Sequence, residues 1–187
     1  GADDFIAKPY DSPEVILARC ERIIQLYEDK SIITSTEKDH LTDLYTLEFF
    51  NEYIRQIDSL NIEKSYDALV LNIEHFHMVN EMFGRKAGDD VLKMLSDLVT
   101  DTFKDSFCIG CRPAADYFYF YLDHNDGYDH IVSSVQERLA GFSHIPKIHL
   151  RAGVYFDADK SLTPDCRFDH AKFACDRIRG DYSSQVS

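Results

Sequence analysis

The stretch that decides the fold is Arg112-Pro113-Ala114-Ala115-Asp116-Tyr117-Phe118-Tyr119-Phe120-Tyr121-Leu122. From Phe118 onward, phenylalanine and leucine alternate with tyrosine. A two-residue period is typical of a β-strand, here with one apolar face and one face that can form hydrogen bonds. The residues before Tyr117 read as a turn. We therefore expect a hairpin whose strands are residues 107–111 and 117–122.

Helical and strand patterns alternate on both sides of this hairpin. Apolar spacing predicts a helix marked by residues 47–57, and helices over residues 88–103, 127–139 and 168–179. Strands are predicted over residues 67–74 and 148–156. This order of elements favours an α+β fold of ferredoxin type, in which helices flank an antiparallel-centred sheet.

Composition narrows the class of protein. The chain has 187 residues, is 44% hydrophobic and carries a formal net charge of -13, so nucleic acid and membrane surfaces are not expected as partners. No apolar run approaches the roughly 20 residues that cross a bilayer, and the start does not have a signal-peptide pattern. The five cysteines are an odd number without secretory features, which favours reduced thiols and a cytoplasmic location.

The first residues resemble the end of a response-regulator receiver domain. Gly1-Ala2-Asp3-Asp4-Phe5-Ile6-Ala7-Lys8-Pro9-Tyr10 is similar to the last strand and loop of that family, and Ser12-Pro13-Glu14 has the pattern of a helix start. Ile16, Ile23 and neighbouring apolar residues form a stripe at helical spacing. We expect a receiver remnant over residues 1–28, a linker over 29–38 and a second domain over 39–187. The stripe predicts that this N-terminal helix packs on a second copy of the chain, which would form a homodimer, or folds back on its own chain.

Two motifs carry a second resemblance. Asp39-His40-Leu41-Thr42-Asp43-Leu44-Tyr45 and Phe76-x-x-x-Asn80-x-x-x-Gly84-x-x-x-Gly88-Asp89, together with the hairpin, resemble the GGDEF family of diguanylate cyclases over about residues 39–181. The resemblance implies a ferredoxin-like palm, the nucleotidyl cyclase-like fold. It also implies a reaction in which two GTP molecules condense to cyclic di-GMP, with two Mg²⁺ ions stabilising the transferring phosphoryl group.

The metal-binding positions of the family are altered in this sequence. The acid at the end of the first strand corresponds to Asn72, and the acid at the fourth hairpin position to Tyr117. An amide and a phenol are poor ligands for Mg²⁺. Glu74 and Asp116 match acidic family positions and are the candidate catalytic residues of any remaining activity. We expect no metal at Asn72, Asp116 and Tyr117, and Mg²⁺ only if GTP still binds.

The nucleotide-binding positions are altered in part. Ala114 and Ala115 replace the paired glycines of the hairpin, and an aspartate, Asp176, stands where the family has a phosphate-binding lysine. The resemblance assigns Asn80, Asp89 and Phe76 to nucleotide binding, because an amide and a carboxylate suit the edge of guanine. The alternative is that Asn80 and Asp89 simply cap helix ends.

These features favour a catalytically inactive GGDEF domain in a cyclic di-GMP response regulator, acting as a regulatory, GTP-binding or interaction module. Two alternatives stay open: a weakly active diguanylate cyclase and a structural dimerisation spacer. By analogy with related proteins, an EAL phosphodiesterase domain is expected to follow in a full-length protein.

Overall fold

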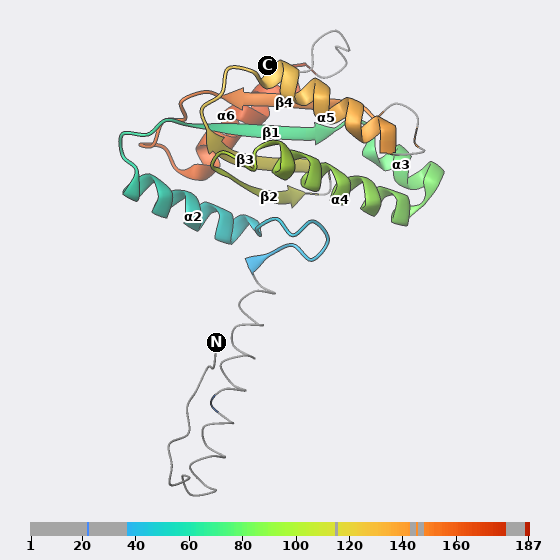
Figure 1. Ribbon diagram of the computed structural model, residues 1–187, viewed down its shortest axis with the longest axis horizontal. Helices are drawn as coiled ribbons and strands as arrows, with labels where there is room; N and C mark the ends of the chain where they lie inside the picture. Colours follow the sequence, from blue (N-terminus) through green and yellow to red (C-terminus); the bar gives the residue numbers. More distant parts are fainter. Residues whose placement is uncertain (1–21, 23–36, 115, 143–144, 146–147, 179–185) are drawn as a thin grey trace, which may run out of the picture. The chain divides into compact units, whose positions relative to one another are not determined.

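The chain divides into two compact units, Gly1–Glu37 and Lys38–Ser187. The computed structural model describes Arg22 and residues 37–114, 116–142, 145, 148–178 and 186–187 (Figure 1). The predicted receiver remnant, its apolar stripe and the linker lie outside the described residues, apart from Arg22, Glu37 and Lys38. The described fold is therefore that of the second unit.

One four-stranded sheet forms the centre of this unit. Its order is β2-β3-β1-β4, and each strand pairs with its neighbours antiparallel. The strands are β1 (Tyr66–Ile73), β2 (Cys108–Ala114), β3 (Tyr117–Asp123) and β4 (Leu150–Tyr155). The predicted hairpin and the antiparallel-centred α+β fold are thus confirmed, with β3 of the hairpin and β1 as the two inner strands.

Five helices of the described residues flank the sheet. They are α2 (Leu47–Leu60), α3 (Phe76–Phe83), α4 (Arg85–Thr102), α5 (Tyr128–Phe142) and α6 (Pro164–Arg177). The short helix α3 was not predicted. The predicted start of α6 at residue 168 was wrong by four residues, because the Thr163 side chain accepts a hydrogen bond from the Cys166 amide and Pro164 fits the first helical turn.

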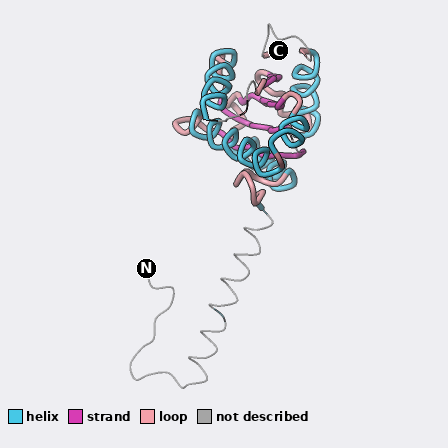
Figure 2. Tube along the Cα trace, turned by 90° about the vertical axis from the view of Figure 1, so that its right-hand side faces the viewer, coloured by secondary structure: helices cyan, strands magenta, loops and turns pink. Residues whose placement is uncertain are grey.

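The helices cover both faces of the sheet (Figures 1 and 2). Residues of α3, α4 and α5 pack on one face, and residues of α2 and α6 pack on the other. The alternation in β3 follows this division. Phe118, Phe120 and Leu122 enter the first core cluster, while the three tyrosines of the strand lie in or against the second. The two-faced pattern predicted from the sequence is therefore confirmed.

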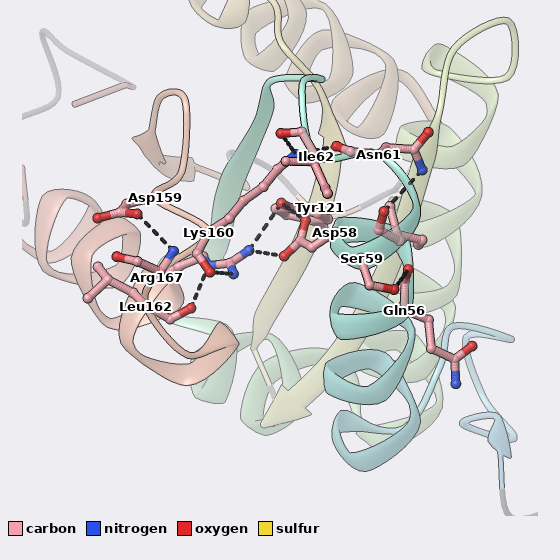
Figure 3. A network of polar contacts seen from close by, with 12 residues as sticks. Gln56, Asp58, Ser59, Asn61, Ile62, Tyr121, Asp159, Lys160, Leu162 and Arg167 are labelled. Carbon is pink, nitrogen blue, oxygen red and sulfur yellow. Dashed lines mark hydrogen bonds and ion pairs between the residues drawn. The ribbon is translucent and has the colours of Figure 1, made fainter.

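A buried arginine joins the elements of the α2 and α6 face (Figure 3). The Arg167 side chain on α6 donates to Asp58 Oδ2 at 2.6 Å and to the Tyr121 hydroxyl at 3.1 Å. The same guanidinium donates to the backbone oxygens of Leu162 and Lys160 at 3.0 and 3.1 Å. With most of its donors satisfied, Arg167 fastens α2 and β3 to the segment that leads into α6.

A second buried charge holds the start of β1. Asp67 is fully buried and accepts hydrogen bonds from the Tyr128 hydroxyl at 2.8 Å and from the backbone amides of Asn125 and Asp157 at 3.1 and 2.8 Å. Its Oδ1 also lies 3.0 Å from Nδ1 of His124. Because these partners come from two segments, residues 124–128 and Asp157, Asp67 fixes the end of the sheet opposite to the hairpin tip.

Both edges of the sheet are partly covered. The Tyr45 amide donates to the Gly110 carbonyl at the edge of β2, and Val186 forms a parallel bridge with Ala152 at the edge of β4.

Among the helices of the described residues, none combines the length and the apolar character of a membrane-spanning helix.

Candidate functional site

The register of the sheet brings three polar residues together at the end of β1. Asn72 lies opposite Tyr117 on β3 and opposite Arg151 on β4. Directly opposed residues in an antiparallel pair project to the same face, so the three side chains share the face that α6 covers. We call Asn72, Glu74, Tyr117, Arg151 and Asp176 the Arg151 cluster.

Asn72 has only 2% of its surface exposed, and both ends of its amide are occupied. Its Oδ1 accepts a hydrogen bond from Nη2 of Arg151. Its Nδ2 donates to the backbone oxygen and to the Oδ2 carboxylate oxygen of Asp116, both at 3.1 Å. The neutral amide therefore bridges an arginine and an aspartate, a role that a carboxylate could not fill because it has no donor.

Arg151 is the centre of the cluster, with 7% of its side chain exposed. Its Nε lies 3.1 Å from Glu74 Oε1, an ion pair without the alignment of a hydrogen bond. Its Nη1 donates to the Cys175 carbonyl at 3.4 Å and lies 3.8 Å from Asp176 Oδ1. The sequence reasoning missed Arg151. The available signal was an arginine inside an apolar strand, which requires buried anionic partners.

Tyr117 and Asp176 form the far side of the cluster. The Tyr117 hydroxyl donates to Asp176 Oδ1 at 2.9 Å. Burial and this carboxylate raise the pKa of Tyr117 to about 12, so the phenol is neutral at pH 7. The ammonium of Lys172 lies 4.9 Å from the centroid of the Tyr117 ring. Asp176 is thus a hydrogen-bond acceptor for Tyr117.

The hairpin tip is anchored to the start of the domain. Arg112 forms an ion pair of 2.9 Å with Asp39, and the same aspartate accepts hydrogen bonds from the amide and hydroxyl of Thr42 at 2.9 and 2.7 Å. Burial alone would raise the pKa of Asp39, but the contacts with Thr42 and Arg112 outweigh it and lower the pKa. The motif that begins at Asp39 therefore positions the hairpin through Arg112. Ala115 lies outside the described residues.

The residues predicted to read guanine meet at the junction of α3 and α4. Gly84 turns the chain there with a φ of +86°. A Cβ on Gly88 would lie 2.0 Å from Asn80 Oδ1 and 3.1 Å from Phe76 Cζ, so both side chains press against this glycine. Asp89 is the next residue and is exposed. The structure thus brings Asn80 and Asp89 to one corner and places Phe76, 6% exposed, beneath it as a core residue.

The donor set at the end of β1 does not fit a pair of Mg²⁺ ions. Mg²⁺ requires anionic oxygens at about 2.0–2.1 Å in octahedral geometry. Here Asn72 is an amide bound to Arg151, Glu74 is paired with the same arginine, and Tyr117 is a neutral phenol. Over the described part of the chain, no three His, Cys, Asp or Glu side chains are grouped as a metal site.

Two of the cavities that described residues line lie away from the Arg151 cluster. One, of about 490 Å³, is bordered by the segment after Lys38, by the second half of α4 and by β2. The other, of about 200 Å³, lies between α2, the hairpin and α6 and includes Asn51, Tyr119 and Phe168. Neither cavity is lined by a residue that the sequence assigned to catalysis or nucleotide binding.

Comparison with known proteins gives one family. Residues 36–156 match the family described as "Diguanylate cyclase, GGDEF domain". The chain is 29% identical over 98 residues to the cyclic di-GMP phosphodiesterase NbdA of Pseudomonas aeruginosa. These aligned residues are 51% of this chain and 12% of that protein. The chain therefore spans far less than two thirds of the length of this relative.

Solved structures agree on the fold. The coiled coil and GGDEF domain of DgcB from Caulobacter crescentus, in complex with c-di-GMP, has a TM-score of 0.76 and 14% identity, covering 95% of this chain and 99% of that one. The S helix-GGDEF-EAL segment of LapD from Vibrio cholerae, bound to c-di-GMP, has a TM-score of 0.66 and 15% identity, covering 87% of this chain and 39% of that one. At these identities the likeness shows the fold alone.

Proposed function

Since the chain belongs to the GGDEF family of diguanylate cyclases, we propose that it is a non-catalytic member that serves as a regulatory domain in cyclic di-GMP signalling. The observation that carries this proposal is the pairing of Asn72 with Arg151. Where the family places a metal-binding acid, this chain has an amide whose oxygen already accepts from a guanidinium. The transition state of phosphoryl transfer needs cations on its oxygens, and this arrangement does not supply them.

The two predicted catalytic carboxylates, Asp116 and Glu74, also have other partners. Asp116, the predicted catalytic acid of the hairpin, accepts from the Asn72 amide through its Oδ2 and through its backbone oxygen. Glu74, the other predicted catalytic residue, is paired with Arg151. Both predicted catalytic carboxylates are therefore used to hold the end of β1, which supports a structural role for them.

The corner formed by Asn80 and Asp89 supports nucleotide sensing as part of the same proposal. Its amide and carboxylate can match the donors and acceptors of guanine. Without metal and without the family lysine, any GTP would be held by its base more than by its phosphates. We infer a binding role for Asn80 and Asp89, with Phe76 supporting them from the core.

The relatives suggest how such a domain is used. NbdA is a cyclic di-GMP phosphodiesterase, and the similar LapD segment joins a GGDEF domain to an EAL domain. We propose by analogy that this domain works within a larger response regulator, with an EAL phosphodiesterase domain as its output. We also infer a cytoplasmic location, because Cys108, Cys111, Cys166 and Cys175 are free thiols.

A product assay tests the central claim. The purified chain is incubated with GTP and Mg²⁺, and cyclic di-GMP is measured by mass spectrometry beside an active diguanylate cyclase. We expect no product above background. Turnover that the Asp116→Ala variant abolishes would overturn the proposal and establish the weak cyclase.

Calorimetry with GTP, in the presence and absence of Mg²⁺, separates the remaining readings. Heat that is lost in the Asn80→Ala variant supports nucleotide sensing. Absence of heat, with no product in the first assay, leaves the dimerisation spacer.

A further inference from the structure

We propose that the Arg151 guanidinium is a built-in cation that takes the place of divalent metal in this domain. This inference rests on the proposed function, because it explains how a GGDEF fold stays charge-balanced without metal. It assigns a role to a residue that lies outside the motifs used to recognise the family.

The first argument is position. Arg151 reaches three groups that surround the end of β1: the Asn72 amide oxygen, the Glu74 carboxylate at 3.1 Å and the Asp176 carboxylate at 3.8 Å. A divalent ion serving the same oxygens would have to displace the guanidinium, because Asn72 Oδ1 already faces Nη2. The arginine and a metal ion therefore exclude each other.

The second argument is charge and burial. The side chains of Arg151 and Glu74 are 7% and 8% exposed. A buried charge that loses its partner destabilises the fold far more than an exposed one. Glu74 thus requires a cation close to it, and Arg151 is the one that the described contacts supply. Asp176 and Asp116 add further negative charge within the same network.

The third argument is that the arginine is held in place. It is in register with Asn72 on β1, and its Nη1 donates to the Cys175 carbonyl of α6. Gly153, two residues along β4 on the same face, lets α6 approach the sheet, since a Cβ there would meet the Ala171 carbonyl at 2.0 Å. Contacts with both the sheet and α6 hold the guanidinium in one position, in the same way that ligands hold a structural metal ion.

A double-mutant cycle on the whole chain tests the role. Arg151→Met keeps much of the side-chain volume and removes the charge, and Glu74→Gln removes the charge of its partner. We expect Arg151→Met to lower the Tm by about 10 °C. Adding Glu74→Gln should then raise the Tm, because the buried carboxylate no longer lacks a cation. A role in packing alone would give no such coupling.

The matched control is Arg138→Met, which removes an exposed arginine paired with Asp101 at 3.2 Å. We expect a change of at most about 2 °C. Arg151→Met as stable as this control, or no gain from the added Glu74→Gln, would overturn the inference.

A second measurement needs only the unmodified chain, so it stands even if Arg151→Met fails to fold. Magnesium or manganese chloride is titrated without nucleotide, and the Tm and the NMR signal of the Asn72 side-chain amide are followed. We expect no change in either. Paramagnetic broadening by Mn²⁺ confined to Asn72 and its neighbours would show that metal binds beside Arg151, and the inference would be wrong.

The two proposals fail in different ways. Neither measurement contains GTP or reads turnover. Cyclic di-GMP production would overturn the proposed function and, with it, the built-in cation that rests on it. Absence of the Arg151 and Glu74 coupling, with no product formed, would overturn the built-in cation only.

Discussion

Asp67 and His124 show how a single buried carboxylate acts on its surroundings. Asp67 is fully buried, while the His124 side chain is 42% exposed and lies 3.4 Å from the exposed Asp126 carboxylate. The hydrogen bond to Asp67, followed by the charges of Asp67 and Asp126, raises the pKa of His124. The protonated imidazolium is thus stabilised in the folded state relative to the unfolded chain.

This shift predicts a pH-dependent contribution of His124 to stability. A histidine with a raised folded-state pKa stabilises fully below its unfolded pKa of about 6.5, and the effect is lost as the pH rises through the folded value. The difference in Tm between the chain and its His124→Gln variant should therefore be largest near pH 5 and shrink toward about pH 9. Thermal unfolding across this range checks it. A difference that stays constant or grows with pH would contradict the shift.

Arg151 marks the limit of what the sequence predicts about the site. The resemblance predicts the loss of metal ligands from Asn72 and Tyr117, and the loss of a phosphate-binding lysine from Asp176. Their mutual contacts depend on the register of β1 against its two neighbours and on the placement of α6, which residue patterns do not determine. The role of Arg151 as their common partner could therefore be recognised only from the folded structure.

The close approach of α6 to β4 governs stability at the scale of elements. At Gly153, a Cβ would lie 2.0 Å from the Ala171 carbonyl and 2.3 Å from the Cys175 amide, both backbone atoms. Gly153→Ala should therefore destabilise the domain by roughly 1–3 kcal/mol or more, because helix and strand must move apart. Urea-induced unfolding measures the change.

Gly141 in α5 provides the control, since a Cβ there meets nothing within 4 Å. Gly141→Ala should be neutral or stabilise by about 0.5 kcal/mol through lower backbone entropy of the unfolded chain. Equal effects of the two substitutions would show that α6 does not rest on β4 as closely as described.

Most elements could be predicted from the sequence because their apolar residues follow one period over a long stretch. β3, α2 and α4 have such patterns. The short α3 has eight residues, begins after His75 with a φ of +54° and ends at Gly84, so its pattern merges with the loop between strand and helix. Helices this short depend on packing, here of Phe76 and Val79 on the core, rather than on their own periodicity.

The chain divides into two units, and the core of the described residues lies in the second, Lys38–Ser187. Both core clusters are formed by residues after Lys38. We therefore expect a chain of residues 38–187 to unfold cooperatively by itself. If the stripe that includes Ile16 and Ile23 forms the dimer, the full chain should be dimeric and the truncated chain monomeric. Light scattering coupled to size exclusion measures both, and a monomeric full chain would contradict the predicted dimer.

The central strand carries one further consequence. Asp67 and Asn72 stand at opposite ends of β1 and point to opposite faces of the sheet, with their partners on α5 and on β4. Sliding β1 by one residue would turn both side chains into apolar layers and leave buried Arg151 facing hydrocarbon. The two polar residues thus fix the register of β1. A shifted pairing would bury unpaired polar groups at both ends of the strand and raise its free energy, so the chain folds in a single register.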